Sequence, residues 1–72
     1  MLDLTVRQRQ VLDAIRILQV EHHYRPSVRE LGGLLGMKSP SSVQMHLEAL
    51  QRKGVLRRRE LQSGRWTWDV IA

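Results

Sequence analysis

The chain has 72 residues, with 12 Lys and Arg against 7 Asp and Glu, and a net charge of +5. It lacks cysteine, a membrane-length apolar run and a signal-peptide core, which excludes disulfide and thiolate-metal sites and predicts a small cytoplasmic domain. Residues 1–35 contain five basic and four acidic side chains, and residues 36–72 contain seven basic and three acidic ones. This excess of positive charge favours a polyanionic partner. A membrane surface is the weaker alternative, because the basic residues do not form the polar face of one strongly amphipathic helix.

The first predicted helix covers about residues 5–22. Thr5 and Gln8 form a capping-box pattern, in which the Thr5 hydroxyl accepts from the Gln8 N–H while the Gln8 side chain reaches back. The helical spacing of apolar residues predicts a buried side of Val11, Leu12, Ile15 and Leu18. Ile17 and Val20 broaden this side, so we expect more than one neighbour to cover the helix. The side expected to stay exposed consists of Arg7, Asp13, Arg16 and Gln19.

The second predicted helix covers residues 28–35. Pro26 biases the residue before it away from the helical conformation, so the helix begins after this point. Ser27 and Glu30 repeat the capping-box pattern. The apolar spacing predicts a buried side made of Val28, Leu31, Leu34 and Leu35.

Glycines lie inside and at the end of this second helix. Gly32 and Gly33 each cost roughly 1 kcal/mol relative to alanine in a helix, and close approach to another helix would explain that cost. Gly36 ends the helix, and the next helix begins only a few residues later. Two short helices separated by a glycine-containing turn are typical of the helix-turn-helix unit.

The third predicted helix covers residues 40–53. The Ser39 side chain is expected to cap it, and Pro40 suits the first helical position, where no N–H is needed. The buried stripe consists of Val43, Leu47 and Leu50. Gly54 suits a left-handed end of the helix. The opposite side carries Ser41, Ser42, Gln44, Met45 and Glu48.

A buried stripe behind a small polar side is what a helix needs in order to lie in the DNA major groove. An ordinary solvated surface helix is the alternative interpretation of the same pattern. For Met45 the alternative is packing on nearby leucine or tryptophan side chains.

After Gly54 the apolar period changes to two, which predicts a β-hairpin over about residues 55–71 with a turn around Gly64. Trp66 and Trp68 share one face of the second strand, and we expect that face to pack on the helices. Leu56 should face inward, which places Arg58 on the same face with its head in water. Together the elements predict a mainly α (α+β) fold, a three-helix winged helix-turn-helix with a C-terminal hairpin wing.

Metal binding and catalysis are both disfavoured. His22 and His23 are adjacent and point in different directions, and His46 is isolated in sequence, so helix-end histidines explain them better than metal ligands. Potential Ser, His and acidic groups are scattered, and no glycine-rich nucleotide loop occurs. A chain this small can hardly enclose a substrate pocket. We therefore expect no enzyme activity, no cofactor and no small-molecule ligand.

Several stretches resemble the DNA-binding domain of the LexA-type SOS repressors. The resemblance rests on Leu4-Thr5 with Arg7-Gln8, on Pro26-Ser27 with Glu30, and on a series from the turn to the end of the third helix. That series is Leu35-Gly36, Ser39-Pro40, His46-Leu47, Ala49-Leu50 and Arg52-Lys53-Gly54-Val55. The match covers residues 4–56 well and the hairpin loosely. It implies a transcriptional repressor that recognises short inverted repeats in double-stranded DNA, in the bacterial cytoplasm with the nucleoid.

The resemblance also implies which residues contact bases. Carried over by position, they are Ser39, Ser41, Ser42, Gln44 and Met45. Known members have Asn in place of Ser41 and Glu in place of Gln44 and Met45, so the operator sequence does not transfer with the fold. LexA-type repressors also carry a linker and a self-cleaving Ser–Lys peptidase domain that dimerises, and these residues contain neither. The sequence is consistent with a piece of a longer repressor or with a domain that stands alone.

Charge and position predict the phosphate contacts, which are Arg7, Lys38, Arg52, Lys53, Arg57, Arg59 and Arg65. For each of these residues, a solvated surface charge is the alternative. Pairing of two copies on DNA would raise the affinity through effective concentration. The competing hypothesis is a protein-interaction module that uses the Trp66/Trp68 face and does not bind DNA. Salt separates the two hypotheses, because phosphate contacts weaken steeply as salt rises and apolar contacts hardly respond.

Overall fold

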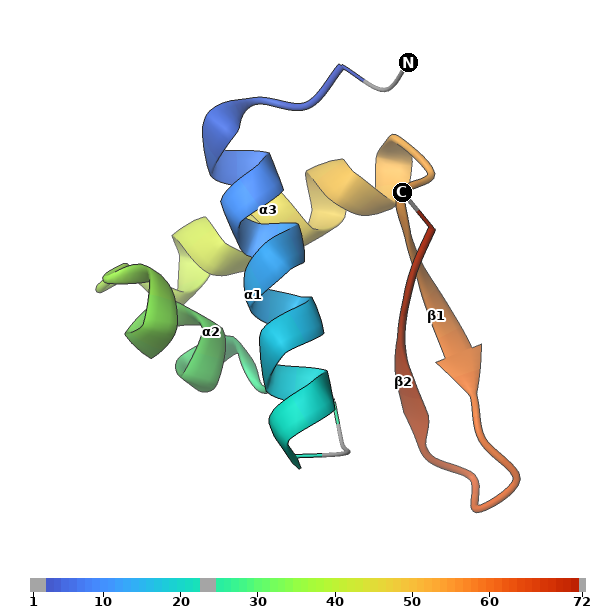
Figure 1. Cartoon of the computed structure of the whole chain (residues 1–72). Coiled ribbons are helices and arrows are strands. Elements are labelled where there is room, and N and C mark those ends of the chain that lie inside the picture. Colours follow the sequence, from blue (N-terminus) through green and yellow to red (C-terminus); the bar gives the residue numbers. More distant parts are fainter. Residues whose placement is uncertain (1–2, 23–24, 72) are drawn as a thin grey trace.

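The computed structural model describes residues 3–22 and 25–71. In chain order its elements are α1 (Val6–His22), α2 (Val28–Leu35), α3 (Pro40–Arg52), β1 (Leu56–Glu60) and β2 (Trp66–Val70). These limits differ from the sequence-based limits by at most one residue at each end. Helix α1 lies between α2 on one side and the β1–β2 hairpin on the other (Figure 1). This arrangement confirms the prediction of a winged helix-turn-helix.

Helix α1 begins with the predicted capping box. The Gln8 N–H donates to the Thr5 hydroxyl at 3.0 Å, and the Thr5 N–H donates to the Gln8 side chain at 3.1 Å. The predicted buried side is also confirmed, and Ala14 adds to it. The broader apolar arc is wrong, because Ile17 and Val20 are exposed. The neighbours of α1 cover one side of it and leave these two side chains in water.

Helix α2 also begins with its predicted capping box, with both bonds between Ser27 and Glu30 at 3.0 Å. Leu31 is fully buried, while Val28 and Leu35 pack against the core from its edge. Leu34 is 52% exposed, so its assignment to the buried side is wrong. A helix this short has room for only a narrow contact with α1 and α3, and Leu34 falls outside that contact.

The two glycines inside α2 differ in their surroundings. A Cβ on Gly32 would lie 3.0 Å from the backbone oxygen of Met37 and 3.6 Å from Cγ2 of Val43 in α3. The close approach predicted from the sequence is therefore present at Gly32. A Cβ on Gly33 would meet nothing within 4 Å, so close approach does not explain this glycine. Gly36 ends the helix with a φ of 69°, and its N–H donates to the Gly32 carbonyl.

We expect alanine to act in opposite directions at these two positions. Gly33→Ala should raise the free energy of unfolding by about 0.5–1 kcal/mol, because alanine loses less backbone entropy in a helix. Gly32→Ala should lower it, because the new methyl group would press on the backbone of the turn between α2 and α3. Urea denaturation of both variants tests this. Equal effects of the two substitutions would contradict the contact at Gly32.

Helix α3 begins at Pro40, as predicted, but without the predicted side-chain cap. Ser39 occupies the N-cap position, yet its hydroxyl makes no capping bond. The Ser39 carbonyl instead accepts from the N–H groups of Ser42 and Val43 at 3.2 and 3.4 Å. At the other end Lys53 is the C-cap residue, and Gly54 follows with a φ of 78°. The left-handed ending at Gly54 is therefore confirmed.

Strands β1 and β2 pair antiparallel, with Leu56 opposite Val70 and Glu60 opposite Trp66. The hairpin is fastened to α1 by Gln19, whose side-chain oxygen accepts from the Thr67 hydroxyl at 2.8 Å and from the Trp68 N–H at 3.1 Å. Gln19 was expected to stay exposed, so that prediction is wrong. The bonds to Gln19 orient β2 against the end of α1.

One hydrophobic core joins the helices and the hairpin. Its buried side chains are Val11, Leu12, Ala14, Ile15, Leu18, Leu31, Val43, Leu47, Leu50, Val55, Leu56 and Trp68. Every element contributes at least one of them. Burial of this shared apolar surface is the main force that holds α3 and the wing at fixed positions relative to α1.

Candidate nucleic-acid interface

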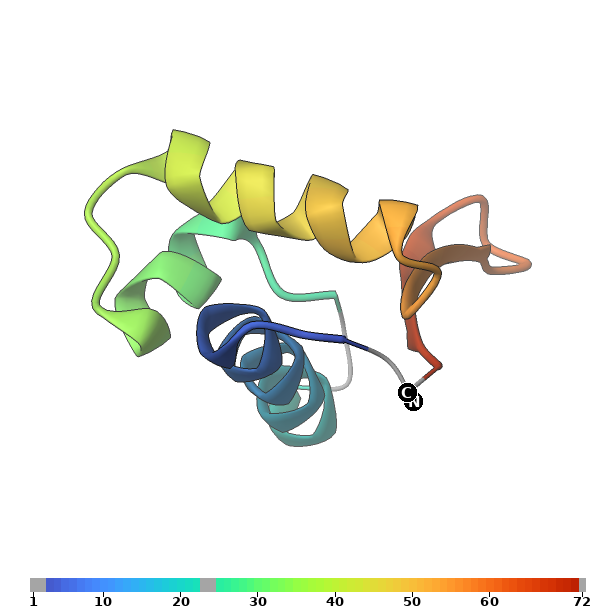
Figure 2. The ribbon, with the colours of Figure 1, turned by 90° about the horizontal axis from the view of Figure 1, so that it is seen from above.

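Helix α3 presents one side to the core and leaves the other uncovered. Val43, Leu47 and Leu50 are buried, as the stripe predicts. Helices α1 and α2 lie on the same side of α3, and none of the described helices and strands lies over its outer side (Figure 2). The outer side is therefore free to enter a groove of a partner. It carries the exposed side chains of Ser41, Gln44, Met45 and Glu48.

The structure brings three of the predicted base-contacting residues together. Ser41, Gln44 and Met45 line one shallow hollow of about 490 Å³, together with Val28, Pro40 and Glu48. Ser42 is half-buried and Ser39 is exposed at the N-cap, and neither lines this hollow. The first turns of α3 thus display hydroxyl, amide and thioether groups side by side. These groups suit contacts to base edges in a groove.

Met45 is 57% exposed. The alternative that it packs on core leucine or tryptophan side chains is therefore wrong. An exposed thioether beside Gln44 offers an apolar contact next to a hydrogen-bonding group. Glu48, one turn further along, brings a carboxylate to the same side of the helix. A carboxylate can accept a hydrogen bond from the cytosine amino group but repels phosphate. Glu48 is therefore better suited to contact a base edge than the DNA backbone.

Basic side chains stand near the start of α3. Lys38 is exposed, and it lines a hollow of about 470 Å³ with Arg29, Met37 and parts of α2 and α3. Arg29 was not among the predicted phosphate contacts. Nothing in the sequence around Arg29 indicates that it lies near Lys38. The packing of α2 on α3 brings the two side chains to the same hollow.

Lys53 is bound within the protein itself. Its ammonium donates to the Asp3 carbonyl at 2.6 Å and to the Gln8 side-chain oxygen at 2.7 Å. Gln8 is 9% exposed, so one nearly buried oxygen serves both the start of α1 and the end of α3. These bonds give Lys53 a positioning role for α3. Arg7 and Arg52 are exposed.

The wing places its arginines on both faces. Arg57 and Arg59 share one face of β1, and Arg58 lies on the other face with Leu56. The head of Arg58 is not simply in water, because its guanidinium carbon lies 4.1 Å from the centre of the Trp66 ring. Arg25, which precedes α2, reaches the same ring at 3.8 Å. No sequence signal connects Arg25 with the hairpin.

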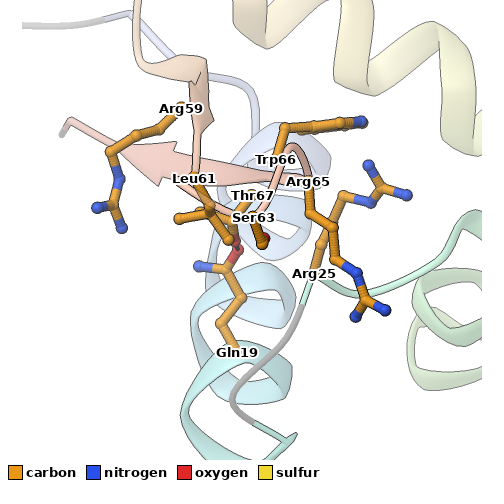
Figure 3. A pocket seen from close by; sticks show the side chains of 8 residues that line it. All are labelled: Gln19, Arg25, Arg59, Leu61, Ser63, Arg65, Trp66 and Thr67. Atoms are coloured by element: carbon orange, nitrogen blue, oxygen red, sulfur yellow. Dashed lines mark hydrogen bonds between the residues drawn. The ribbon is translucent and has the colours of Figure 1, made fainter.

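The end of the hairpin and the end of α1 border a hollow of about 920 Å³ (Figure 3). Its basic lining residues are Arg25, Arg59 and Arg65, and the remainder are Gln19, Leu61, Ser63, Trp66 and Thr67. None of these lining residues is acidic. Arg25 and Arg65 extend to one side of the hairpin and Arg59 to the other (Figure 3). The hollow is therefore electropositive and faces solvent.

The comparison with protein families shows what kind of domain this chain is. Residues 1–64 match the family model described as the LexA DNA-binding domain. The match covers the three helices and β1, and it ends before β2. This chain belongs to the LexA DNA-binding domain family. The matched region is a DNA-binding unit and includes no peptidase domain.

Curated LexA repressors are similar to this chain over most of its length. LexA repressor 2 of Nocardia farcinica is 57% identical over 56 residues, which cover 78% of this chain and 23% of that protein. LexA repressor of Bifidobacterium longum is 54% identical over 54 residues, 75% of this chain and 22% of that protein. LexA repressor of Mycobacterium tuberculosis is 51% identical over 55 residues, 76% of this chain and 23% of that protein. The aligned part thus spans about a quarter of each relative.

Metal binding and membrane-spanning helices can also be assessed in this LexA-family domain. Residues 3–22 and 25–71 contain no group of three or more His, Cys, Asp or Glu side chains that could hold a metal ion. His23, the neighbour of His22 in the sequence, lies outside the described residues. No helix in the described part is long and apolar enough to cross a membrane.

The tryptophan face offers little apolar surface for a protein partner. Trp68 is only 7% exposed and belongs to the core. Trp66 is half-buried, and guanidinium groups lie over its ring. The surface required by the hypothesis of a protein-interaction module is therefore already covered within the domain.

Proposed function

We propose that this LexA-family domain binds duplex DNA at short inverted repeats with α3 in the major groove and the wing on the backbone, and that it acts in transcriptional repression. The observation that carries the proposal is the uncovered side of α3, where Ser41, Gln44 and Met45 line one hollow. The names of the relatives support the repressor role. Binding to the chromosome would place the protein in the bacterial cytoplasm with the nucleoid.

Each base-contacting group has a chemical preference. The Gln44 amide can donate to and accept from one adenine, and the exposed Met45 side chain suits a thymine methyl group. Ser41 and Ser42 can bond to either kind of base edge. The Ser39 hydroxyl makes no capping bond, which leaves it available to DNA at the start of the helix.

The proposed phosphate contacts surround this helix. They are Arg7, Lys38, Arg52, Lys53, Arg57, Arg59 and Arg65. Among them Lys53 has a second role, since its ammonium already bonds to Asp3 and Gln8. It would add its charge to the DNA interface while it holds the end of α3. Two copies on one inverted repeat would form the homodimeric complex.

Selection of binding sites from random duplex DNA, at a low and a high salt concentration, tests the proposal. We expect a short inverted repeat to be recovered at low salt and lost at high salt, because binding releases counterions from the phosphates. Salt-sensitive binding without a motif would contradict the base contacts of α3. Absence of binding at low salt would contradict the proposal as a whole.

Gln44→Ala should relax the base preference at one or two positions of the selected site, by about 1–3 kcal/mol, because it removes a bidentate amide. Binding competitions among single-base variants of the site measure this. Gln10→Ala is the matched control, since Gln10 is an exposed glutamine on α1. A preference that stays unchanged in Gln44→Ala would remove Gln44 from the base-contacting set.

A further inference from the structure

The Trp66 ring holds two cationic side chains from segments far apart in the sequence. The guanidinium carbons of Arg25 and Arg58 lie 3.8 and 4.1 Å from the ring centre. Trp68 fixes the same ring from its edge, with ring centres 4.7 Å apart and planes at 89°. Because Trp68 is part of the core, the orientation of Trp66 is anchored to the fold. We call Trp66, Arg25 and Arg58 the arginine–tryptophan cluster.

The two arginines of this cluster have no ion-pair partner among the described residues. The two guanidinium carbons are at most 7.9 Å apart, the sum of their distances to the ring centre. That separation is comparable with the screening length of about 8 Å at physiological ionic strength, so the two charges repel one another. Neither arginine forms an ion pair with a described residue, although Glu60 lies opposite Trp66 in the hairpin. An anion near both guanidinium groups would relieve the repulsion.

The geometry favours a phosphate over an aromatic ligand. The face of Trp66 is occupied by guanidinium groups, so a nucleobase has little ring surface on which to stack. A guanidinium that stacks on a ring keeps its N–H donors in the plane at its rim, where they can form paired bonds to phosphate oxygens. Arg65 extends to the same side of the hairpin as Arg25 and adds a third positive charge (Figure 3).

The position of the cluster indicates which phosphates it would meet. The hairpin begins just after α3, and Arg25 lies on the segment that leads into α2 (Figure 1). In the proposed complex α3 lies in the major groove and the wing lies on the backbone, so the DNA strand that the wing meets is the one nearest the cluster, because Arg58 and Trp66 are wing residues. We propose that Arg25 and Arg58, held by Trp66, contact the phosphates of that strand. This inference rests on the proposed DNA binding and adds two contacts and one positioning residue to it.

The salt dependence of DNA binding tests the two contacts. Arg25→Gln and Arg58→Gln should each weaken binding to all sequences alike and reduce the slope of log affinity against log salt by about one, because each removes one phosphate contact. Arg9→Gln is the matched control, since Arg9 is an exposed arginine on α1 outside every proposed contact. It should leave the slope nearly unchanged. A slope in Arg25→Gln and Arg58→Gln equal to that of the original chain overturns the inference.

The role of Trp66 needs a separate pair of variants. Trp66→Leu should weaken DNA binding, and Trp66→Tyr should restore most of the affinity, because tyrosine also offers an aromatic face to a guanidinium. Circular dichroism identifies a temperature at which both variants are folded. Equal DNA affinity of the two variants at that temperature overturns the positioning role.

The outcomes separate this inference from the function on which it rests. If the original chain binds no DNA at low salt, the proposed function fails and this inference fails with it. If it binds its selected repeat and both glutamine variants keep the full salt slope, the inference alone fails.

Discussion

Trp68→Ala is expected to lower the free energy of unfolding by about 3–5 kcal/mol, the range typical of a buried aromatic side chain replaced by alanine. Trp68 is 7% exposed and joins the hairpin to the core formed by the helices. A domain of this size has a total stability of roughly 4–11 kcal/mol, so the variant should be marginally folded or unfolded at room temperature. Urea denaturation followed by far-ultraviolet circular dichroism measures the loss.

Trp66→Ala provides the matched control for this experiment. Trp66 lies on the same face of β2 but is only half-buried, so its truncation should cost clearly less. Its contacts with Arg25 and Arg58 are at the surface, where cation–π interactions contribute about 0.5–1 kcal/mol each. A larger loss of stability in Trp66→Ala than in Trp68→Ala would contradict the packing described for the hairpin.

Leu50→Ala is expected to lower the free energy of unfolding by about 2–5 kcal/mol, because it leaves a cavity and removes buried apolar surface. Leu50 is fully buried near the end of α3, where the helix packs on the rest of the core. The same substitution should therefore loosen the end of α3. Urea denaturation gives the stability, and DNA binding at a temperature near the midpoint should fall together with the folded fraction.

Leu34→Ala is the control for Leu50→Ala, because it makes the same chemical change on the surface of a helix. Leu34 is 52% exposed, and surface substitutions of this kind usually change stability by less than about 0.5 kcal/mol. The sequence pattern alone predicts similar costs at the two positions. Similar measured costs would contradict the exposure of Leu34 in the structure.

The interactions that the sequence predicted well are those between residues close together in the chain. Both capping boxes form, at Thr5 with Gln8 and at Ser27 with Glu30. Gly36 and Gly54 adopt left-handed conformations where α2 and α3 end. The apolar stripe of α3 is buried, and its opposite side is uncovered. These features depend on helical geometry over three to seven residues, which the order of side chains encodes directly.

The candidate site was predicted where it lies on a single helix and missed where it joins distant segments. Ser41, Gln44 and Met45 follow from the period of α3, and the structure brings them together. Arg25 could not be connected with Trp66 from the sequence, because the contact depends on how the segment before α2 passes the hairpin.

The sequence by itself determined where the helices and strands begin and end, which side of α3 is apolar, and the excess of positive charge. Only the tertiary structure decided that Gln19 fastens the wing and that Lys53 bonds to Gln8. It also decided that Ile17, Val20 and Leu34 stay in water. The reason is that periodicity fixes the direction of a side chain on its own helix. What the side chain then meets depends on the angle and distance at which another element packs, which is set by the whole core.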